Sequence, residues 1–236
     1  MNALSLFLPN APAAAICLFL ISSLLPAETL TYREVEGELV VTHTVVITTA
    51  PPGYRVELES RRNGGNPVRQ TFHTAADLST VAWTFSDPER RMELEARLQG
   101  KDILLSGTAG NDKFEKKFSA AGAPWNQLFQ MGLPPFVMGG KNSFQFRSIG
   151  TQGPGELKIG KFTVTRRVDE TITLAGKQST AVRLRISLSG LLSVFWHGDY
   201  WYRPGDGRFL RYRGKNRSGG PVAVSELQQE HGDDGR

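Results

Sequence analysis

Apolar and polar residues alternate over short stretches through most of the chain. In the stretch YRVELES, Arg55, Glu57 and Glu59 alternate with apolar residues, which is typical of a strand with one solvated face. RMELEARLQ also fits a helical period, but its neighbours on both sides are strand-like, so we predict a strand there. The other predicted strands lie in GELVVTHTVVITT, VRQTFHT, LSTVAWTFS, DILLSG, KFEKKFS, FQFRSIG, GELKIGKFTVTRRVD, TITLAG, QSTAVRLRISLSG and VAVSEL.

Turn sequences such as PPG, RNGGNP, SDPE and GTAGND separate these stretches. Strand follows strand through short connections, and no long helical spans alternate with them. This order predicts an all-β fold in which about eleven or twelve strands form an antiparallel meander. A meander of that length is expected to curl into a half-barrel or barrel, or to pack as a sandwich.

One segment interrupts the strand pattern midway, in GAPWNQLFQMGLPPFVMGG. Its first proline suits the first turn of a helix, Trp125, Leu128 and Phe129 follow at helical spacing, and Gly132 ends the pattern. We therefore predict a short helix and an apolar loop, about residues 124–138, packed on the concave side of the sheet.

The apolar residues of this segment allow two interpretations. They either fill the concave side as core, which is the commoner use of such residues, or form an adjustable lid over a cavity. Met131 and Met138 favour the lid slightly, because thioethers adapt to varied ligands. The residues that would line or cover a ligand cavity are Trp125, Leu128, Phe129, Leu133 and Phe136.

The first residues are apolar and uncharged as far as Glu28, and the apolar run Ala13–Leu25 breaks at a proline. This pattern predicts a signal peptide over residues 1–27 and a periplasmic protein, with an uncleaved N-terminal membrane anchor as the alternative. A single β domain over 28–228 and a disordered tail over 229–236 would follow.

The only cysteine, Cys17, lies inside the predicted signal peptide. The mature chain would therefore have no disulfide, thiolate metal site or cysteine nucleophile. The formal net charge of +5 is mild, and it suits a protein near anionic envelope surfaces. Because an exported protein does not meet nucleic acid as its usual partner, we expect none here.

Basic residues gather near the C-terminus, in the hairpin sequence that follows PGDG. They either form a solvated sheet face or make a peripheral contact with an anionic membrane or the cell wall. The residues of this predicted basic patch are Arg203, Arg208, Arg211 and Arg213. In the predicted hairpin, Phe209 shares a face with two of them.

Candidate chemistry is sparse. His43, His73, His197 and His231 are scattered over strands and the tail, so we predict no metal site and no cofactor. No nucleophile elbow is present, and turn hydrogen bonding accounts for Asp206. We assign no catalytic residue, although His197 and Asp199 share a strand face, which leaves a minor hypothesis of an enzyme that acts on cell-wall glycans.

The second half resembles a family of exported bacterial envelope proteins, the domain-of-unknown-function 3108 family. The resemblance covers roughly residues 125–227 and rests on KIGKFTVTRRVDETITLAGKQSTAVRLRISLSG and DYWYRPGDGRFLRYRGK. Gly176 matches the turn glycine, Trp201 and Tyr202 the aromatic strand, and Arg211 the arginine after the hairpin turn. The family implies a half-barrel similar to that of the lipoprotein carriers of the Lol pathway, and it implies no activity.

These observations predict a periplasmic, non-enzymatic β protein. Our first hypothesis is that it binds an apolar or amphiphilic envelope ligand, a lipid or a lipidated peptide, in the curved sheet. The alternative is an envelope scaffold with a filled core that meets a partner protein through its surface.

Overall fold

The computed structural model describes residues 27–151, 156–190, 196–216 and 219–232. The predicted signal peptide covers residues 1–27. Residues 1–26 lie outside the described part of the chain, and Ala27 begins the first strand. The strands of the first half are β1 (Ala27–Glu36), β2 (Leu39–Ala50), β3 (Gly53–Arg62), β4 (Val68–Thr74), β5 (Thr80–Asp87), β6 (Met92–Gln99), β7 (Asp102–Ala109) and β8 (Asp112–Ser119). Two short helices, α1 (Phe129–Gly132) and α2 (Pro134–Met138), lead to β9 (Ser143–Thr151), β10 (Leu157–Arg166), β11 (Glu170–Leu174), β12 (Lys177–Leu188), β13 (His197–Tyr202), β14 (Phe209–Lys215) and β15 (Val222–Gly232).

All fifteen strands belong to one antiparallel sheet. The order is β8-β7-β6-β5-β4-β3-β2-β1-β15-β14-β13-β12-β10-β9, with β11 paired to β12 only. The predicted all-β antiparallel meander is therefore confirmed, with more strands than the sequence indicated. Among the described strands, β8 and β9 end the path and do not pair with each other, so the sheet is curled but not closed into a barrel.

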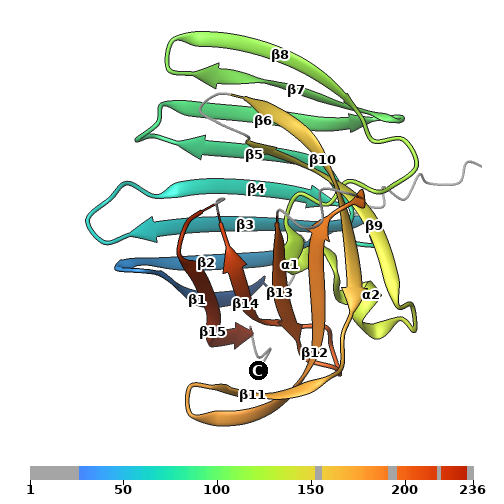
Figure 1. Ribbon diagram of the computed structural model, residues 1–236. Coiled ribbons are helices and arrows are strands. Elements are labelled where there is room, and N and C mark those ends of the chain that lie inside the picture. Colours follow the sequence, from blue (N-terminus) through green and yellow to red (C-terminus); the bar gives the residue numbers. More distant parts are fainter. Residues whose placement is uncertain (1–26, 152–155, 191–195, 217–218, 233–236) are drawn as a thin grey trace, which may run out of the picture.

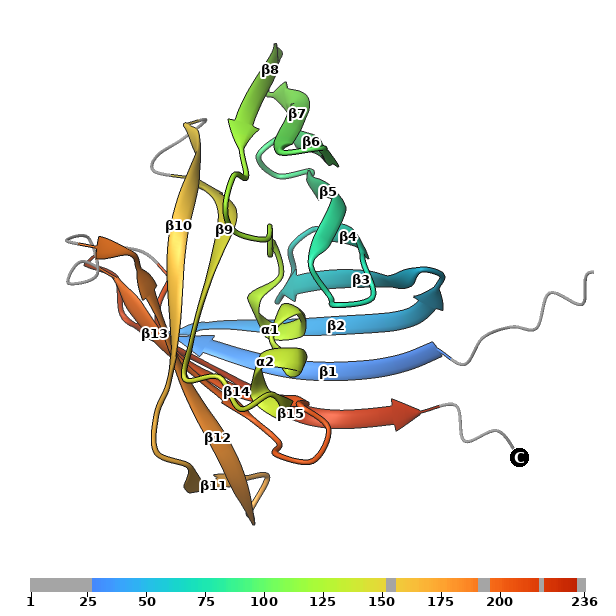
Figure 2. The same cartoon turned by 90° about the vertical axis from the view of Figure 1, so that its right-hand side faces the viewer.

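The sheet bends so that its two halves face each other. In Figure 1, β2–β8 run across the direction of β10 and β12. Figure 2 shows α1 and α2 on the concave side, between the first strands and the β9–β10 pair. The predicted placement of the 124–138 segment inside the curved sheet is thus confirmed.

The helix within this segment begins later than predicted. Residues 124–128 are not helical, and Leu128 has extended backbone angles (φ −108°, ψ 95°). The α1 helix covers only Phe129–Gly132, and α2 follows with prolines in its first turn, where a missing N–H costs nothing. Gly132 does end α1, as the sequence indicated.

Tertiary hydrogen bonds explain why the chain stays extended at Trp125. Its carbonyl accepts a hydrogen bond from the backbone N–H of Thr80 at the start of β5 (2.7 Å). On the other side, the N–H of Asn126 donates to the carbonyl of Arg147 in β9 (2.9 Å), and Arg147 donates to Pro124 (2.8 Å). The segment therefore joins the two facing halves of the sheet, which an α-helix at this point could not do.

The core consists of the inward-facing residues of both halves. Aromatic rings dominate the second half, where Phe129 of α1 lies 4.9 Å from Phe146 and 5.1 Å from Phe162 between ring centroids. The hydroxyl of the fully buried Tyr202 donates to the carbonyl of Phe129 (3.2 Å). Burial raises the pKa of Tyr202 well above its usual value, so this hydroxyl stays a donor and holds α1 against β13.

The prediction that Phe209 shares a sheet face with Arg211 and Arg213 is wrong, because the hairpin contains a β-bulge. The register between β13 and β14 shifts between Trp201 and Tyr202, so Phe209 pairs with Tyr202 and turns inward, while Arg211 pairs with Trp201. Phe209 packs on Tyr32 with ring centroids 5.2 Å apart. It does not share a face with the arginines, because the extra residue of the bulge reverses the alternation.

The last strand is longer than predicted. β15 runs to Gly232 and pairs with β1 as far as Glu28. Residues 229–232, which the sequence analysis assigned to a disordered tail, are therefore part of the sheet. Gln229, Glu230 and His231 are all polar and exposed, which suits a strand end with both faces solvated. Residues 233–236 lie outside the described part of the chain.

Candidate functional site

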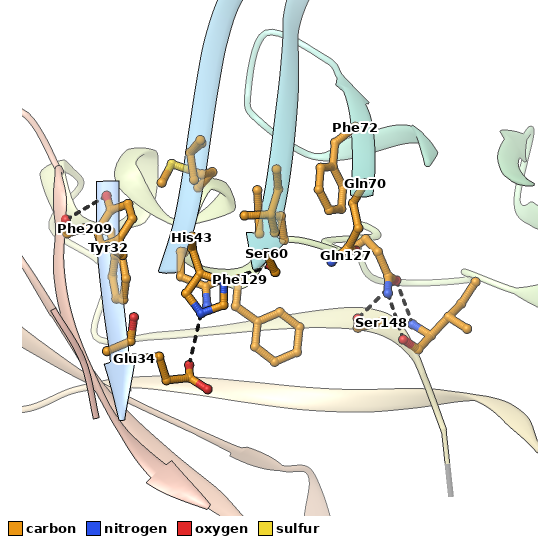
Figure 3. A pocket seen from close by; sticks show the side chains of 17 residues that line it. Tyr32, Glu34, His43, Ser60, Gln70, Phe72, Gln127, Phe129, Ser148 and Phe209 are labelled. Atoms are coloured by element: carbon orange, nitrogen blue, oxygen red, sulfur yellow. Dashed lines mark hydrogen bonds and ion pairs between the residues drawn. The ribbon is translucent and has the colours of Figure 1, made fainter. Parts of the chain in front are cut away.

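A cavity of about 350 Å³ lies between the inner face of β1–β4 and the α1 segment (Figure 3). Strands β9, β14 and β15 complete its walls. The alternation of the strands selects the residues that face it, because every second side chain points inward. The lining residues are Tyr32, Glu34, His43, Val45, Leu58, Ser60, Gln70, Phe72, Gln127, Leu128, Phe129, Gln130, Met131, Ser148, Ile149, Phe209 and Ser225.

Strand register places a polar row on one wall of the cavity. His43 of β2 stands opposite Ser60 of β3, and its Nδ1 is 2.8 Å from the Ser60 Oγ. The carboxylate of Glu34 on β1 lies 3.6 Å from Nε2 of the same ring. Figure 3 shows Glu34, His43 and Ser60 together at the cavity.

The Glu34 carboxylate is largely buried, with 17% of its side chain exposed. Burial, the largest single influence, raises the pKa of Glu34. The nearby His43 and the amide of Asn216, which donates to Glu34 Oε1 (2.9 Å), together outweigh burial and hold the pKa of Glu34 below its ordinary value. The cavity therefore contains an ionised carboxylate at neutral pH.

The His43 ring is only partly satisfied. Its Nδ1 contacts Ser60, whereas its buried Nε2 has no hydrogen-bond partner. The 3.6 Å between Nε2 and Glu34 is an ion-pair distance and exceeds an ordinary hydrogen bond. A buried polar atom without a partner is uncommon in proteins and is an attachment point for a ligand or water.

Apolar side chains lie next to the polar row, on the same strands and on the residues around α1. Val45 of β2 stands opposite Leu58 of β3, and Phe72, Leu128 and Met131 lie beside them around the cavity. The arrangement is amphipathic, with apolar side chains for a hydrocarbon group beside a polar row for one polar end. The other polar lining residues are Gln70, Gln127, Gln130, Ser148 and Ser225.

Gln127 holds the residues that precede α1 against β9. Its Oε1 accepts hydrogen bonds from the backbone N–H of Ile149 (2.9 Å) and the indole of Trp125 (2.9 Å). Its Nε2 donates to the carbonyl of Ile149 (2.8 Å). The side chain thus imitates a neighbouring strand along the β9 edge and holds the segment that leads into α1.

The five predicted ligand-binding residues divide into two groups. Leu128 and Phe129 line the cavity. Trp125, Leu133 and Phe136 are buried, with at most 7% exposed, and they belong to the core rather than to the cavity wall. The segment therefore acts partly as core and partly as cavity wall, so the two interpretations of its apolar residues both apply to part of it.

The polar wall was missed from the sequence. The sequence pattern indicates only single histidines on strands, and it assigns no role to Glu34 or Ser60. A signal was present, because His43 lies between Val41 and Val45 at a spacing of two residues, which places the imidazole on the buried face of β2. What the sequence could not indicate is that Glu34 and Ser60 flank it, because this depends on strand register.

The predicted basic patch is largely neutralised. Arg213 is exposed on β14, whereas the other three arginines form ion pairs with carboxylates of β1, β15 and the hairpin turn. The pairs are Arg203 with Asp206 (3.1 Å) and Glu230 (2.8 Å), Arg208 with Glu28, and Arg211 with Glu226 (2.6 Å).

Asp199, on the outer face of β13, forms ion pairs with two arginines of β12. Arg183 donates to it at 2.8 Å, and Arg185 does so through two nitrogens at 2.9 and 3.0 Å. Burial raises the pKa of Asp199, but the hydrogen bonds from Arg185 and Arg183 outweigh burial and hold the pKa below its ordinary value. The Asp206 carboxylate caps its own turn by accepting from the Arg208 N–H (3.0 Å), as predicted.

Within the described ranges, no three His, Cys, Asp or Glu side chains are grouped so that they could hold a metal ion. None of the described helices has the length and apolar character needed to cross a membrane.

Comparisons with known proteins give distant similarities only. No family model matches the chain, and no curated protein matches it, so the resemblance to the 3108 family stays a prediction. Among solved structures, the hypothetical lipoprotein YmcC from Escherichia coli K12 is 10% identical with a TM-score of 0.42, over 87% of this chain and 88% of that chain. A DUF1329 family protein from Desulfovibrio piger is 9% identical with a TM-score of 0.30, over 91% and 88%. Likeness at this level carries no inference about function.

Proposed function

We propose that this protein is an exported, periplasmic, non-enzymatic carrier or sensor that binds a single-chain amphiphile in the cavity beneath α1. Export rests on the apolar N-terminal segment of the sequence. Binding rests on one observation above all: the cavity combines apolar side chains with a polar row that holds an ionised carboxylate and an unpartnered imidazole nitrogen.

The volume favours a small ligand. Ligand pockets usually span about 300–1,000 Å³, and the 350 Å³ found here is at the lower end of that range. A single acyl or alkyl chain suits this space better than a diacyl lipid. The apolar chain would lie against Leu58, Phe72 and Met131, and the polar end would reach the row formed by Glu34, His43 and Ser60.

The polar row contains the residue types of a serine hydrolase, but its geometry supports binding rather than catalysis. Ser60 lies two residues before the end of β3, where it pairs with His43 of β2 and Val68 of β4. The backbone around Ser60 therefore belongs to the sheet ladder, whereas an oxyanion hole needs free N–H groups. The minor hypothesis of a glycan-acting enzyme has little support, because Asp199 is already bound by two arginines.

The scaffold alternative has less support than ligand binding. A scaffold with a filled core would leave no cavity under α1, and a basic contact face would need unpaired arginines. The cavity and the ion pairs of Arg203, Arg208 and Arg211 both favour the ligand-binding hypothesis.

A matched pair of methionine variants tests the proposal. Met131 lines the cavity, whereas Met138, seven positions later, is 57% exposed. Titration calorimetry with decanol, below its solubility limit, should show one saturable site in the wild-type protein. M131W fills the cavity and should weaken binding about tenfold or more, whereas M138W should stay within about twofold.

No saturable binding of decanol to the wild-type protein would contradict the proposal and favour the scaffold. Equal affinities of M131W and M138W would contradict the assignment of the cavity as the site. Circular dichroism spectra that match the wild type establish that both variants are folded.

A further inference from the structure

The cavity has an unusual charge composition for a lipid site. Among the seventeen residues that line it, Glu34 is the only acidic residue, His43 is the only histidine, and there is no lysine or arginine. A site for a fatty-acid carboxylate or a phosphate normally offers a cationic or N–H-rich partner. This site instead offers a hydrogen-bond acceptor, the carboxylate of Glu34.

The free acceptor positions converge on one place. Asn216 occupies one position on Oε1 of Glu34 (2.9 Å), and a carboxylate accepts at about four positions in all. The Nε2 atom of His43, 3.6 Å from Oε2, has no hydrogen-bond partner. In the tautomer whose proton is on Nδ1, facing Ser60, Nε2 accepts, and a donor placed between Glu34 and His43 would satisfy both groups at once.

The nearest arginine does not reverse this balance. Arg208 lies close enough to Tyr32 to affect its hydroxyl electrostatically, but the guanidinium is paired with Glu28 and does not line the cavity. An anionic headgroup would therefore lie beside a buried carboxylate with no compensating cation, and like charges in a desolvated site repel strongly.

We propose that the cavity selects single-chain amphiphiles whose polar end is a primary amine, and that Glu34, beside the His43 ring, is the group that recognises this end. The inference rests on the proposed function, because it assigns the ligand class of the same cavity. An ammonium group carries three N–H donors and a positive charge, which matches the two acceptors and the one negative charge of the polar row.

Four ligands with the same alkyl chain separate charge from hydrogen bonding. Decylamine, decanol, decanoate and decyltrimethylammonium are titrated calorimetrically into the wild-type protein at pH 7. We expect decylamine to bind most tightly, decanol next, and decanoate at least about tenfold more weakly than decylamine. Decyltrimethylammonium, which is cationic but has no N–H donor, should also bind more weakly than decylamine.

A matched pair of glutamate variants identifies the recognising group. Glu36 lies on the same strand and also accepts a hydrogen bond from Asn216 (3.1 Å), but it is outside the cavity. E34Q should reduce the preference for decylamine over decanoate by about tenfold, whereas E36Q should leave it unchanged. Decanol affinity should change little in either variant, because decanol is neutral.

The outcomes separate this inference from the proposed function. If all four ligands bind wild type equally and M131W weakens all of them, the cavity binds amphiphiles but the amine preference is refuted. If decanoate binds most tightly, the amine preference is likewise refuted. If no ligand binds, both proposals fail. The wild-type ranking alone is decisive even if E34Q does not fold.

Discussion

Gln127 offers the sharpest test of how the segment before α1 is held. Q127A removes one side-chain amide that makes four hydrogen bonds. These join it to the backbone N–H and C=O of Ile149 (2.9 and 2.8 Å), the Trp125 indole (2.9 Å) and the Ser148 hydroxyl (3.2 Å). The alanine leaves both polar groups of Ile149 and the indole N–H without their partners.

The magnitude follows from burial. Trp125 is 1% exposed and Ile149 is 4% exposed, so water reaches the orphaned groups poorly. Each unsatisfied buried group costs about 1–3 kcal/mol. With partial relief from water entering the space of the lost side chain, we expect Q127A to lower the free energy of unfolding by about 2–5 kcal/mol. This is a large share of the roughly 5–15 kcal/mol that stabilises an ordinary domain.

Urea denaturation followed by circular dichroism measures this loss, with Q130A as the matched control. Gln130 is three residues away and also lines the cavity, but its side chain forms no hydrogen bond in the described part of the structure. Q130A should change the free energy of unfolding by no more than about 0.5 kcal/mol. A loss below about 1 kcal/mol in Q127A, or equal losses in both variants, would refute the reasoning.

Two further predictions concern the second half of the sheet. D199N removes the carboxylate between two arginines of β12 and should cost about 1–3 kcal/mol at neutral pH. Because the pKa of Asp199 is below its ordinary value of 3.8, this contribution is present above that value and disappears as the pH falls through the lowered pKa. Urea titrations of wild type and D199N should therefore converge in acid, and a constant difference would contradict the ion-pair assignment. G207A should lower the free energy of unfolding by about 2 kcal/mol or more, because Gly207 has φ +70° and a Cβ there would lie 2.7 Å from Cβ of Pro134 in α2. In thermal denaturation, G205A should be nearly neutral, since a Cβ at Gly205 meets nothing within 4 Å, and similar losses in the two glycine variants would argue against this contact.

The alternation of single strands was predictable from the sequence. Arg55 and Glu57 are exposed on β3 and Val56 between them is buried, as the period of two indicates. The fold class followed, because strands joined by short turns leave few alternatives to an antiparallel meander. Whether the sheet closes was not predictable, since closure depends on accumulated twist and stagger rather than on local pattern.

Tertiary contacts decided the points where local pattern failed. The helical spacing around Trp125 suggested a helix, but hydrogen bonds to Thr80 and Arg147 keep the backbone extended there. The face of Phe209 changed because a bulge inserts one residue into β14. Such interactions between distant strands are invisible to a window of a few residues.

In the candidate site, too, the local features were predictable and those that depend on contacts between strands were not. Leu128 and Phe129 were predicted to face a cavity, and they line it. Glu34, His43 and Ser60 come together only because three strands pair in one register. Sequence reasoning therefore reached the apolar side of the site, which is local, and missed the polar side, which depends on the sheet.

The most direct test of the central claim is a crystal structure of the protein soaked with a decylamine that carries bromine at the end of its chain. The account predicts an anomalous peak inside the cavity beside Leu58, Phe72 and Met131, with the amine between Glu34 and His43. Bromine located only on the outer surface of the sheet, or a cavity that stays empty at saturating ligand, would contradict it.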